Sequence, residues 1–174
     1  QYSRLLVAPH GIRKNLLEKI ERERRNHLDG KPSQIRWKIN SLVDNVMIEA
    51  LYAAAKDGVP IEIVVRGACS FRMSKVAQYR NVKIRSILGR FLEHSRIFHF
   101  ANAGNDEHWI GSADLMHRNL DRRVEALVRV DQNEHKNELS QILELSVSPR
   151  FRMWKMEEDD TWRYIKNGSE GSAL

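Results

Sequence analysis

The stretch that decides the fold runs from residue 34 to 65, QIRWKINSLVDNVMIEALYAAAKDGVPIEIVV. Its first part, 34–40, alternates apolar and polar residues, which is typical of a strand. Residues 42–56 carry apolar side chains at helical spacing and are followed by a glycine and a proline, which predicts a helix and its end. Residues 61–65 are β-branched and almost wholly apolar, as in a buried central strand. This order predicts a right-handed crossover between parallel strands.

The same patterns extend in both directions from this unit. A strand at 3–8 and a helix at 11–28 precede it, which predicts parallel pairing at the front of the chain as well. The later segments are strands at 82–88, 94–100, 108–112 and 124–130, a helix at 134–146, and a β-hairpin at 151–156 and 161–165. The closely spaced strands after residue 95 favour antiparallel pairing. The predicted fold class is therefore α/β, with a mixed sheet flanked by helices. It forms one domain over residues 1–166 with a flexible tail at 167–174.

The composition limits the classes of protein that this chain can represent. It has 174 residues, with 29 Lys and Arg against 23 Asp and Glu, and a formal net charge of +6. This length allows one domain with an ordinary core. The single cysteine, Cys69, excludes a disulfide framework and a cysteine-rich zinc site. No apolar run approaches the ~18 residues of a membrane span, so no transmembrane segment is expected. Because the chain begins with Gln1, we expect a fragment of a longer protein.

Basic residues concentrate between positions 66 and 96, where Glu93 is the one acidic residue. They are Arg66, Arg72, Lys75, Arg80, Lys83, Arg85, Arg90 and Arg96. Such a cluster favours an anionic partner, namely phosphate, polyphosphate or nucleic acid. A solvated basic face without a partner explains the charge equally well.

The stretch with the most chemical content is 91–100, FLEHSRIFHF. If 94–100 is a strand, His94 and Arg96 point to the same face, because side chains alternate along a strand. An imidazole beside a guanidinium suits phosphoryl chemistry. The imidazole donates a proton or acts as a nucleophile, and the guanidinium binds phosphate oxygens. A lone H-x-R is more often a structural pair, so the neighbouring motifs decide its interpretation.

Two further residues supply that context. Residues 111–114, GSAD, place Asp114 where it could orient His94 or pair with Arg96, with an ordinary turn as the alternative. Arg66 follows the apolar strand at 61–65, where α/β sheets often bind phosphate, although a plain surface arginine also fits. The order H-x-R … G-S-x-D resembles the phospholipase D signature H-x-K … G-S-x-N. That superfamily joins two such half-sites, and this chain carries one.

A longer resemblance covers about residues 4–165, nearly the whole chain. The segments that carry it are 40–44 (NSLVD), 65–67 (VRG), 89–97 (GRFLEHSRI), 112–114 (SAD) and 118–125 (RNLDRRVE). In this order they resemble the C-terminal domain of bacterial polyphosphate kinases of the large, phosphohistidine-forming type. The resemblance implies a phospholipase D-like half of an enzyme that reversibly moves the terminal phosphate of ATP onto inorganic polyphosphate. It also implies a phosphohistidine, and residues that hold Mg²⁺, in a preceding domain absent here.

The resemblance also implies roles for single residues. His94 would contact the phosphates of ATP and donate a proton, and Arg66 would bind phosphate. We add Arg96 as a further phosphate ligand and Asp114 as a supporting residue, and we expect no metal ligand in this chain. Lys38 and Asn40, on one face of the strand at 34–40, are candidate supporting residues outside that set. The segment 70–75 (SFRMSK) departs from the Pro/Gly-rich loop that is usual in the family.

The expected partners follow from the same resemblance. They are ATP or ADP, inorganic polyphosphate, the preceding domains of the same polypeptide and further copies in a homo-oligomer. The implied location is the cytoplasm or the periphery of the inner membrane, and the fragment by itself is expected to be inactive. Two alternatives stay open: a phospholipase D-like phosphodiesterase or nuclease that acts as a homodimer, and a non-catalytic polyanion-binding module. Salt-sensitive polyanion binding that survives His94→Ala would favour the module.

Overall fold

The computed structural model describes residues 4–87, 92–148 and 152–166. The predicted tail at 167–174 and residues 89–91 of the motif at 89–97 lie outside these ranges. The domain boundary at residue 166 therefore stays a prediction.

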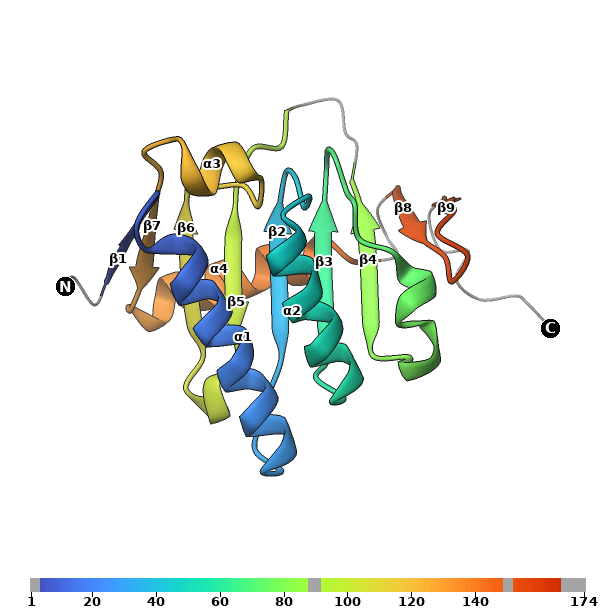
Figure 1. Ribbon diagram of the computed structural model, residues 1–174, viewed down its shortest axis with the longest axis horizontal. Coiled ribbons are helices and arrows are strands. Elements are labelled where there is room, and N and C mark those ends of the chain that lie inside the picture. The colour runs from blue at the N-terminus through green and yellow to red at the C-terminus, as the bar shows by residue number, and fades with distance from the viewer. Residues whose placement is uncertain (1–3, 88–91, 149–151, 167–174) are drawn as a thin grey trace.

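In the described residues, nine strands form one mixed sheet in the order β1-β7-β6-β5-β2-β3-β4-β8-β9 (Figure 1). The strands are β1 (Leu5–Val7), β2 (Ile35–Ile39), β3 (Ile61–Val65), β4 (Val82–Ser86), β5 (Ile97–Phe100), β6 (Glu107–Gly111), β7 (Ala126–Val130), β8 (Met153–Met156) and β9 (Trp162–Ile165). The prediction of a mixed sheet flanked by helices is confirmed, and so is the C-terminal hairpin, in which β8 pairs antiparallel with β9.

The centre of the sheet is parallel, as the sequence predicts. β3 pairs in parallel with β2 on one side and with β4 on the other. The crossover from β2 to β3 is α2 (Asn45–Lys56), and Asp44 caps it by accepting a hydrogen bond from the backbone N of Met47 at 3.0 Å. Because β2 and β3 run in the same direction, the loops that follow them emerge at the same edge of the sheet.

The first strand differs from the prediction. β1 pairs antiparallel with β7 at the edge of the sheet, and β7, β6 and β5 separate it from β2. The helix that joins β1 to β2, α1 (Ile12–Leu28), therefore spans four positions of the sheet. Local periodicity marks β1 as a strand but carries no information on which distant strands come between it and β2.

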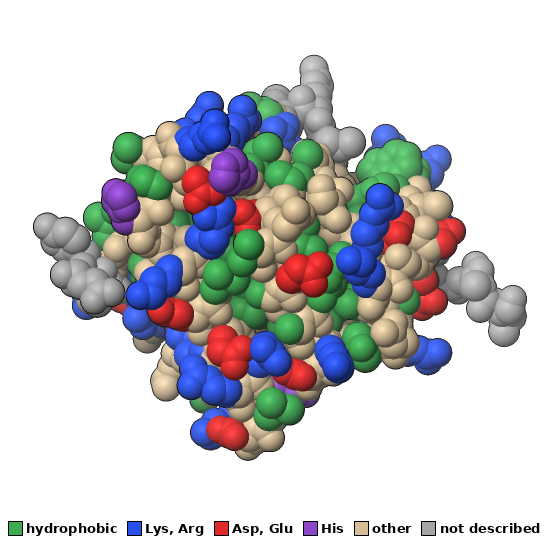
Figure 2. Space-filling view, viewed as in Figure 1, with side chains coloured by type: hydrophobic (Ala, Val, Ile, Leu, Met, Phe, Trp, Pro, Cys, Tyr) green, Lys and Arg blue, Asp and Glu red, His purple; other side chains and the backbone are tan. Residues whose placement is uncertain are grey.

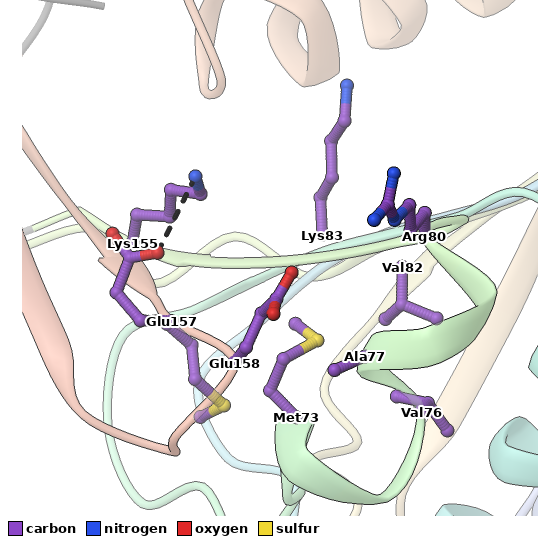
Figure 3. A pocket seen from close by; sticks show the side chains of 10 residues that line it. Met73, Val76, Ala77, Arg80, Val82, Lys83, Lys155, Glu157 and Glu158 are labelled. Carbon is purple, nitrogen blue, oxygen red and sulfur yellow. Dashed lines mark ion pairs between the residues drawn. The ribbon is translucent and has the colours of Figure 1, made fainter. Parts of the chain in front are cut away.

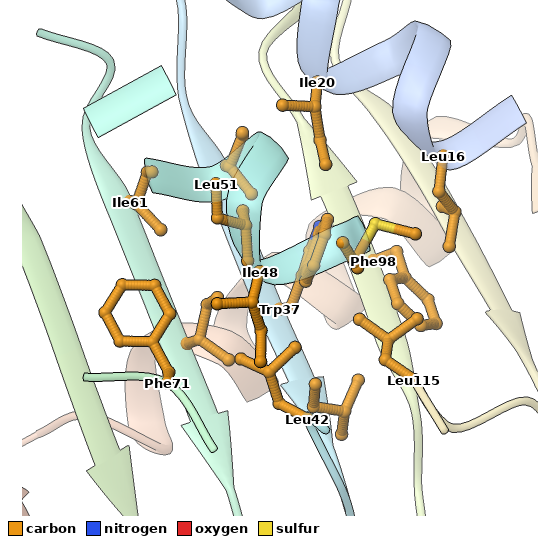
Figure 4. Packing of buried hydrophobic residues seen from close by; sticks show 14 of the residues in the cluster. Leu16, Ile20, Trp37, Leu42, Ile48, Leu51, Ile61, Phe71, Phe98 and Leu115 are labelled. Atoms are coloured by element: carbon orange, nitrogen blue, oxygen red, sulfur yellow. The ribbon is translucent and has the colours of Figure 1, made fainter. Parts of the chain in front are cut away.

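Helices cover both faces of the sheet (Figure 1). α1 and α2 lie on one face, and α4 (Asn133–Leu145) crosses the other. Under α1 and α2, the ring of Trp37 meets Phe98 and Phe100 edge to face, at centroid distances of 5.4 and 5.9 Å (Figure 4). All three side chains are fully buried. Aromatic pairs of this kind contribute about 0.5–1.5 kcal/mol each beyond their buried area, so they anchor β2 to β5.

Short helices complete the fold. They are α3 (His117–Asp121) and the 3₁₀ turns η1 (Met73–Lys75), η2 (Ala77–Tyr79) and η3 (Asn102–Gly104). No helix in the described ranges combines the length and the apolar character that a membrane span needs.

Candidate phosphate-binding site

The candidate site lies at the edge of the sheet where β2 and β3 end. Leu42, just after β2, forms isolated parallel bridges with Cys69, after β3, and with Leu115, after β6. Backbone hydrogen bonds of 2.6 to 3.1 Å run between the same loops. Together they form what we call the rim, defined as residues 40–44, 66–70 and 112–116. Side chains on the rim are therefore held by backbone that is tied on two sides.

Arg66, His94 and Asn40 form a chain of contacts at this rim. Arg66 directly follows β3, and its Nε donates to Oδ1 of Asn40 at 3.1 Å. Nδ2 of the same amide lies 3.4 Å from Nδ1 of His94. We call these three residues the amide bridge. Asn40 thus connects the two residues that the resemblance assigns to phosphate, although the sequence pattern indicated it only as a supporting candidate.

His94 lies in an exposed loop rather than in a strand. β5 begins at Ile97, so the prediction of a strand over 94–100 is wrong for residues 94–96. Strand alternation therefore does not place His94 and Arg96 on one face. In place of a strand ladder, side chains hold this segment: Glu93 and Ser95 bond Lys38 of β2, and Arg96 bonds Asp114 of the rim.

Lys38, on β2, holds the loop that contains His94 in place. Its Nζ donates to Oε2 of Glu93 at 2.8 Å and to Oγ of Ser95 at 2.7 Å, the two residues that flank His94. Asn40 directly follows β2, two positions after Lys38, and both side chains reach the same loop on one face of the sheet. That one face therefore holds the loop through Lys38 and the His94 ring through Asn40.

Arg96 and Asp114 form a buried ion pair. Nη2 of Arg96 donates to Oδ2 of Asp114 at 2.7 Å, and Nη1 donates to the backbone O of His94 at 3.0 Å. The other carboxylate oxygen, Oδ1, accepts from the backbone N of Asn40 at 2.9 Å and of Ser41 at 3.1 Å. Of the two partners considered for Asp114 in the sequence, Arg96 is the one that it contacts.

The two departures from the phospholipase D signature are therefore one structural feature. Arginine stands in place of lysine and aspartate in place of asparagine, and the two bond to each other. Arg96 is only 9% exposed and Asp114 only 7%. Because its guanidinium is buried and engaged, Arg96 does not fit the predicted role of a phosphate ligand. It holds the backbone of His94 instead.

The basic residues of 66–96 are clustered in the sequence but lie in several separate places in the structure. Arg66 and Arg96 lie at the rim. Arg72 and Lys75 form ion pairs of 3.8 Å with Asp160 and Glu49. Arg80 and Lys83 line a cavity elsewhere, and Arg90 lies outside the described residues.

That cavity has a volume of about 390 Å³ and lies between η1, η2, the start of β4 and the C-terminal hairpin (Figure 3). Met73, Val76 and Met156 line it with buried apolar side chains, whereas Arg80 and Lys83 are exposed. It lies at the amino end of β4, and the rim lies at the carboxyl end of the neighbouring β3. A smaller cavity of about 240 Å³ adjoins the rim and is lined by Gly67, Cys69, Ser86, Trp154 and Trp162. The larger cavity is therefore not where the predicted site residues meet.

Exposed arginines on and after α3 add positive charge next to the rim. Arg118, Arg122 and Arg123 are exposed, and their side chains have no hydrogen bond or ion pair with any described residue. Figure 2 shows Lys and Arg side chains gathered at the top of the molecule, over α3. In the sequence these arginines stand out, because three of the six residues at 118–123 are arginine. They were noted there only as part of the family motif at 118–125.

The described residues do not fit an Mg²⁺ site. Within the described ranges, no group of three or more His, Cys, Asp and Glu could hold a metal ion. Both carboxylate oxygens of Asp114 already accept hydrogen bonds from N–H groups, which leaves them poorly placed to bind a cation as well.

The chain resembles known proteins over almost its whole length. Residues 5–173 match the family model for the polyphosphate kinase C-terminal domain 2. The chain is 44% identical over 173 residues to the polyphosphate kinase of Streptomyces coelicolor and 48% identical over 161 residues to that of Mycobacterium avium. These alignments cover 99% and 92% of this chain but 23% and 22% of the relatives. The chain thus spans less than a quarter of the curated relatives that it matches.

Solved structures agree with the sequence matches. The crystal structure of polyphosphate kinase from Porphyromonas gingivalis matches 100% of this chain and 27% of its own, with a TM-score of 0.90 and 34% identity. Nuc from Salmonella typhimurium, a phospholipase D family member, matches 82% of this chain and 90% of its own, with a TM-score of 0.57 and 19% identity. The second match shows the fold alone and confirms the predicted phospholipase D-like architecture. From its sequence, its fold and the order of its motifs, the chain belongs to the polyphosphate kinase C-terminal domain family.

Proposed function

We propose that this domain supplies one half of the active site of a polyphosphate kinase, which reversibly transfers the terminal phosphate of ATP to inorganic polyphosphate. The amide bridge carries this proposal, because it holds a guanidinium and an imidazole together at an exposed edge of the sheet. A guanidinium binds phosphate oxygens with a permanent charge, and an imidazole adds a directed hydrogen bond. Phosphoryl transfer depends mainly on such positioning and charge stabilisation.

The residues divide into two roles in this proposal. Arg66 and His94 contact the phosphates of ATP or polyphosphate, since no other described residue engages the Nη atoms of Arg66 and the His94 side chain is exposed. Arg96 and Asp114 act as positioning residues. Their ion pair fixes the backbone of His94 on one side and that of Asn40 on the other.

The free arginines beside the rim give the site a path for a polyanion. Arg118, Arg122 and Arg123 extend the positive charge of Arg66 away from the reacting phosphate. Charge of one sign along a surface raises the local concentration of an oppositely charged chain and guides its approach. This arrangement supports inorganic polyphosphate, a long polyanion, as the second substrate.

Other parts of the activity lie outside this chain in our proposal. The phosphohistidine and the residues that hold Mg²⁺ belong to further domains, because the rim offers no carboxylate free to bind a metal. Assembly into a homo-oligomer and a cytoplasmic location stay predictions from the resemblance.

The phosphodiesterase alternative has less support from the site. Of the signature residues His94, Arg96 and Asp114, only His94 is exposed, and the other two are joined in the buried ion pair. A homodimer would therefore bring together two histidines without the flanking signature groups. Hydrolysis of an activated phosphodiester, lost in His94→Ala, would favour this alternative over a kinase.

The test of the proposal is synthesis of polyphosphate from ATP by the natural gene product that contains this chain. We expect His94→Ala to lower the rate by about 10²–10³-fold, the usual cost of removing one hydrogen-bond donor that stabilises developing charge. Arg66→Ala should raise the KM for ATP and lower kcat, and Arg66→Lys should restore part of the loss, because lysine keeps the charge but not the fork geometry. Arg80→Ala, an exposed arginine at the other cavity, is the matched control and should keep the activity. Ordinary rates in both His94→Ala and Arg66→Ala would refute the proposal.

A further inference from the structure

We infer that Asn40 is a positioning residue that sets the tautomer of His94, so that His94 meets phosphate as a neutral hydrogen-bond donor through Nε2–H. This inference rests on the proposed function for the nature of the ligand, but its main readout does not depend on activity. It differs from the role of proton donor that the family resemblance implies for His94.

The orientation of the Asn40 amide follows from Arg66. Nε of an arginine can only donate, so the atom that faces it at 3.1 Å must be the carbonyl oxygen, Oδ1. The NH₂ group, Nδ2, then points to Nδ1 of His94 at 3.4 Å. Because an amide NH₂ can only donate, Nδ1 must be the acceptor and carries no proton. In a neutral imidazole the proton is then on Nε2.

Asn40 is held too firmly to reverse this arrangement. Its backbone N donates to Asp114, and its carbonyl O accepts from the backbone N of Gly67 at 2.6 Å. A Cβ on Gly67 would lie 2.8 Å from that carbonyl O, so the two backbones approach as closely as a glycine allows. The Asn40 side chain is 6% exposed, and a flip would set its NH₂ against the Nε–H of Arg66.

The groups around the ring fit an Nδ1 that carries no proton. The groups that face His94 are Asn40 from the rim, Arg66 beyond that amide, and Arg96, which donates to the His94 backbone O. The nearby carboxylates are occupied, since Glu93 bonds Lys38 and Asp114 bonds Arg96. A protonated ring would carry a hydrogen on Nδ1 that meets the Asn40 NH₂ group. Fixed positive charge therefore comes from Arg66, and His94 adds a directed Nε2–H to the same phosphate.

The experiment reads the tautomer directly. This chain is labelled with ¹⁵N-histidine, and the ring nitrogen shifts of His94, assigned by their loss in His94→Ala, are measured at a pH where the ring is neutral. Folding of each variant is checked by the dispersion of its amide spectrum. Wild type should carry the proton on Nε2. Asn40→Asp keeps an oxygen for Arg66 but offers His94 only an acceptor, so the proton should move to Nδ1. Asn45→Asp makes the same charge change at an exposed position and should leave the tautomer unchanged.

Activity and binding complete the test. In the full gene product, Asn40→Asp should lower kcat about 10–100-fold, and combining it with His94→Ala should add little further loss, because both act through one ring. A folded Asn40→Asp chain whose His94 keeps its proton on Nε2 would overturn the inference. Normal activity of His94→Ala would instead refute the proposed function and leave the tautomer result standing.

Discussion

The exposed His94 and the buried pair of His99 and His108 show how differently one side chain is used within a short stretch of this chain. His94 stands at the rim, where an amide contacts its ring. His99 and His108 face each other across β5 and β6, with ring centroids 4.6 Å apart and exposures of 4% and 1%. Nε2 of His108 bonds Oγ of Ser140 on α4 at 3.0 Å, so the pair packs that helix against the sheet.

Burial is the main cause of the shifted pKa values of His99 and His108. It lowers the pKa of His108 to about 4, and the positive field of a protonated His99 adds to this effect. Burial also lowers the pKa of His99, although the carboxylate of Asp106, 3.4 Å away, opposes the shift. At neutral pH both rings are therefore uncharged packing groups. The difference teaches that environment, and not residue type, decides which histidine is available to a ligand.

The largest expected effect is the difference in unfolding free energy lost when Asp114 at the rim, or Asp106 beside the histidine pair, is replaced by alanine. Asp114→Ala at the rim should cost about 3–5 kcal/mol of unfolding free energy, because it leaves Arg96 buried without a counter-charge. It also removes the acceptor of the backbone N–H groups of Asn40 and Ser41. Asp106→Ala, beside the histidine pair, should cost less than about 1 kcal/mol, because the Asp106 side chain is 55% exposed. Urea unfolding measures both, and equal losses would contradict the contrast.

The next effect concerns pH and belongs to the buried pair. The pKa of His108 is about 4 in the fold and near its ordinary 6.5 when unfolded, so the unfolded chain binds more protons between these values. Stability is therefore fully present above about pH 6.5 and falls as the pH drops toward 4. The expected loss from His108 is about 3 kcal/mol. Unfolding by urea at a series of pH values measures it.

Two variants sharpen this prediction. His108→Gln keeps an amide that can bond Ser140 and has no titration, so it should weaken the pH dependence between 6.5 and 4.5, and the remainder should come from His99, whose pKa burial also lowers. His94→Gln, at an exposed position away from the pair, is the control. A pH dependence as steep in His108→Gln as in wild type would show that His108 is not its cause.

The smallest effect tests how tightly the rim is packed. Gly67→Ala would place a Cβ 2.8 Å from the carbonyl O of Asn40, and neither backbone can move without breaking a hydrogen bond. We expect a loss of about 1–2 kcal/mol, in the range of other overpacking changes. Gly11→Ala, whose nearest added contact would be 3.2 Å, is the control and should lose less. Thermal unfolding compares the two, and an unchanged Gly67→Ala would mean that the rim can adjust.

Much of the fold could be predicted from local patterns. The helix at 11–28 and the strand at 61–65 match α1 and β3 to within one residue, because amphipathic spacing and β-branched runs reflect local burial. The position of β1 could not be predicted. Its pairing with β7 joins Leu5 to Val128, and nothing near either strand encodes that contact.

The site residues also divide into those that the sequence identified and those whose role depends on distant contacts. Arg66, His94 and Asp114 were identified from motifs, and all three lie at or beside the rim. The function of Arg96 was assigned from strand alternation, which fails because the strand begins at Ile97, three residues later than predicted. Asn40 was undervalued because its importance comes from two partners that lie 26 and 54 residues away in the chain.

The sequence by itself determined the α/β class, the order of the elements, the membership of the family and the residue types that suit phosphate, since these depend on local periodicity and on contiguous motifs. The tertiary structure decided which of those residues face solvent and which form hydrogen bonds or ion pairs that position other residues. It buried Arg96 against Asp114, exposed His94 and placed one amide between an arginine and a histidine. The physical reason is that hydrogen-bond partners and burial are fixed by how distant strands and loops meet at one edge of the sheet.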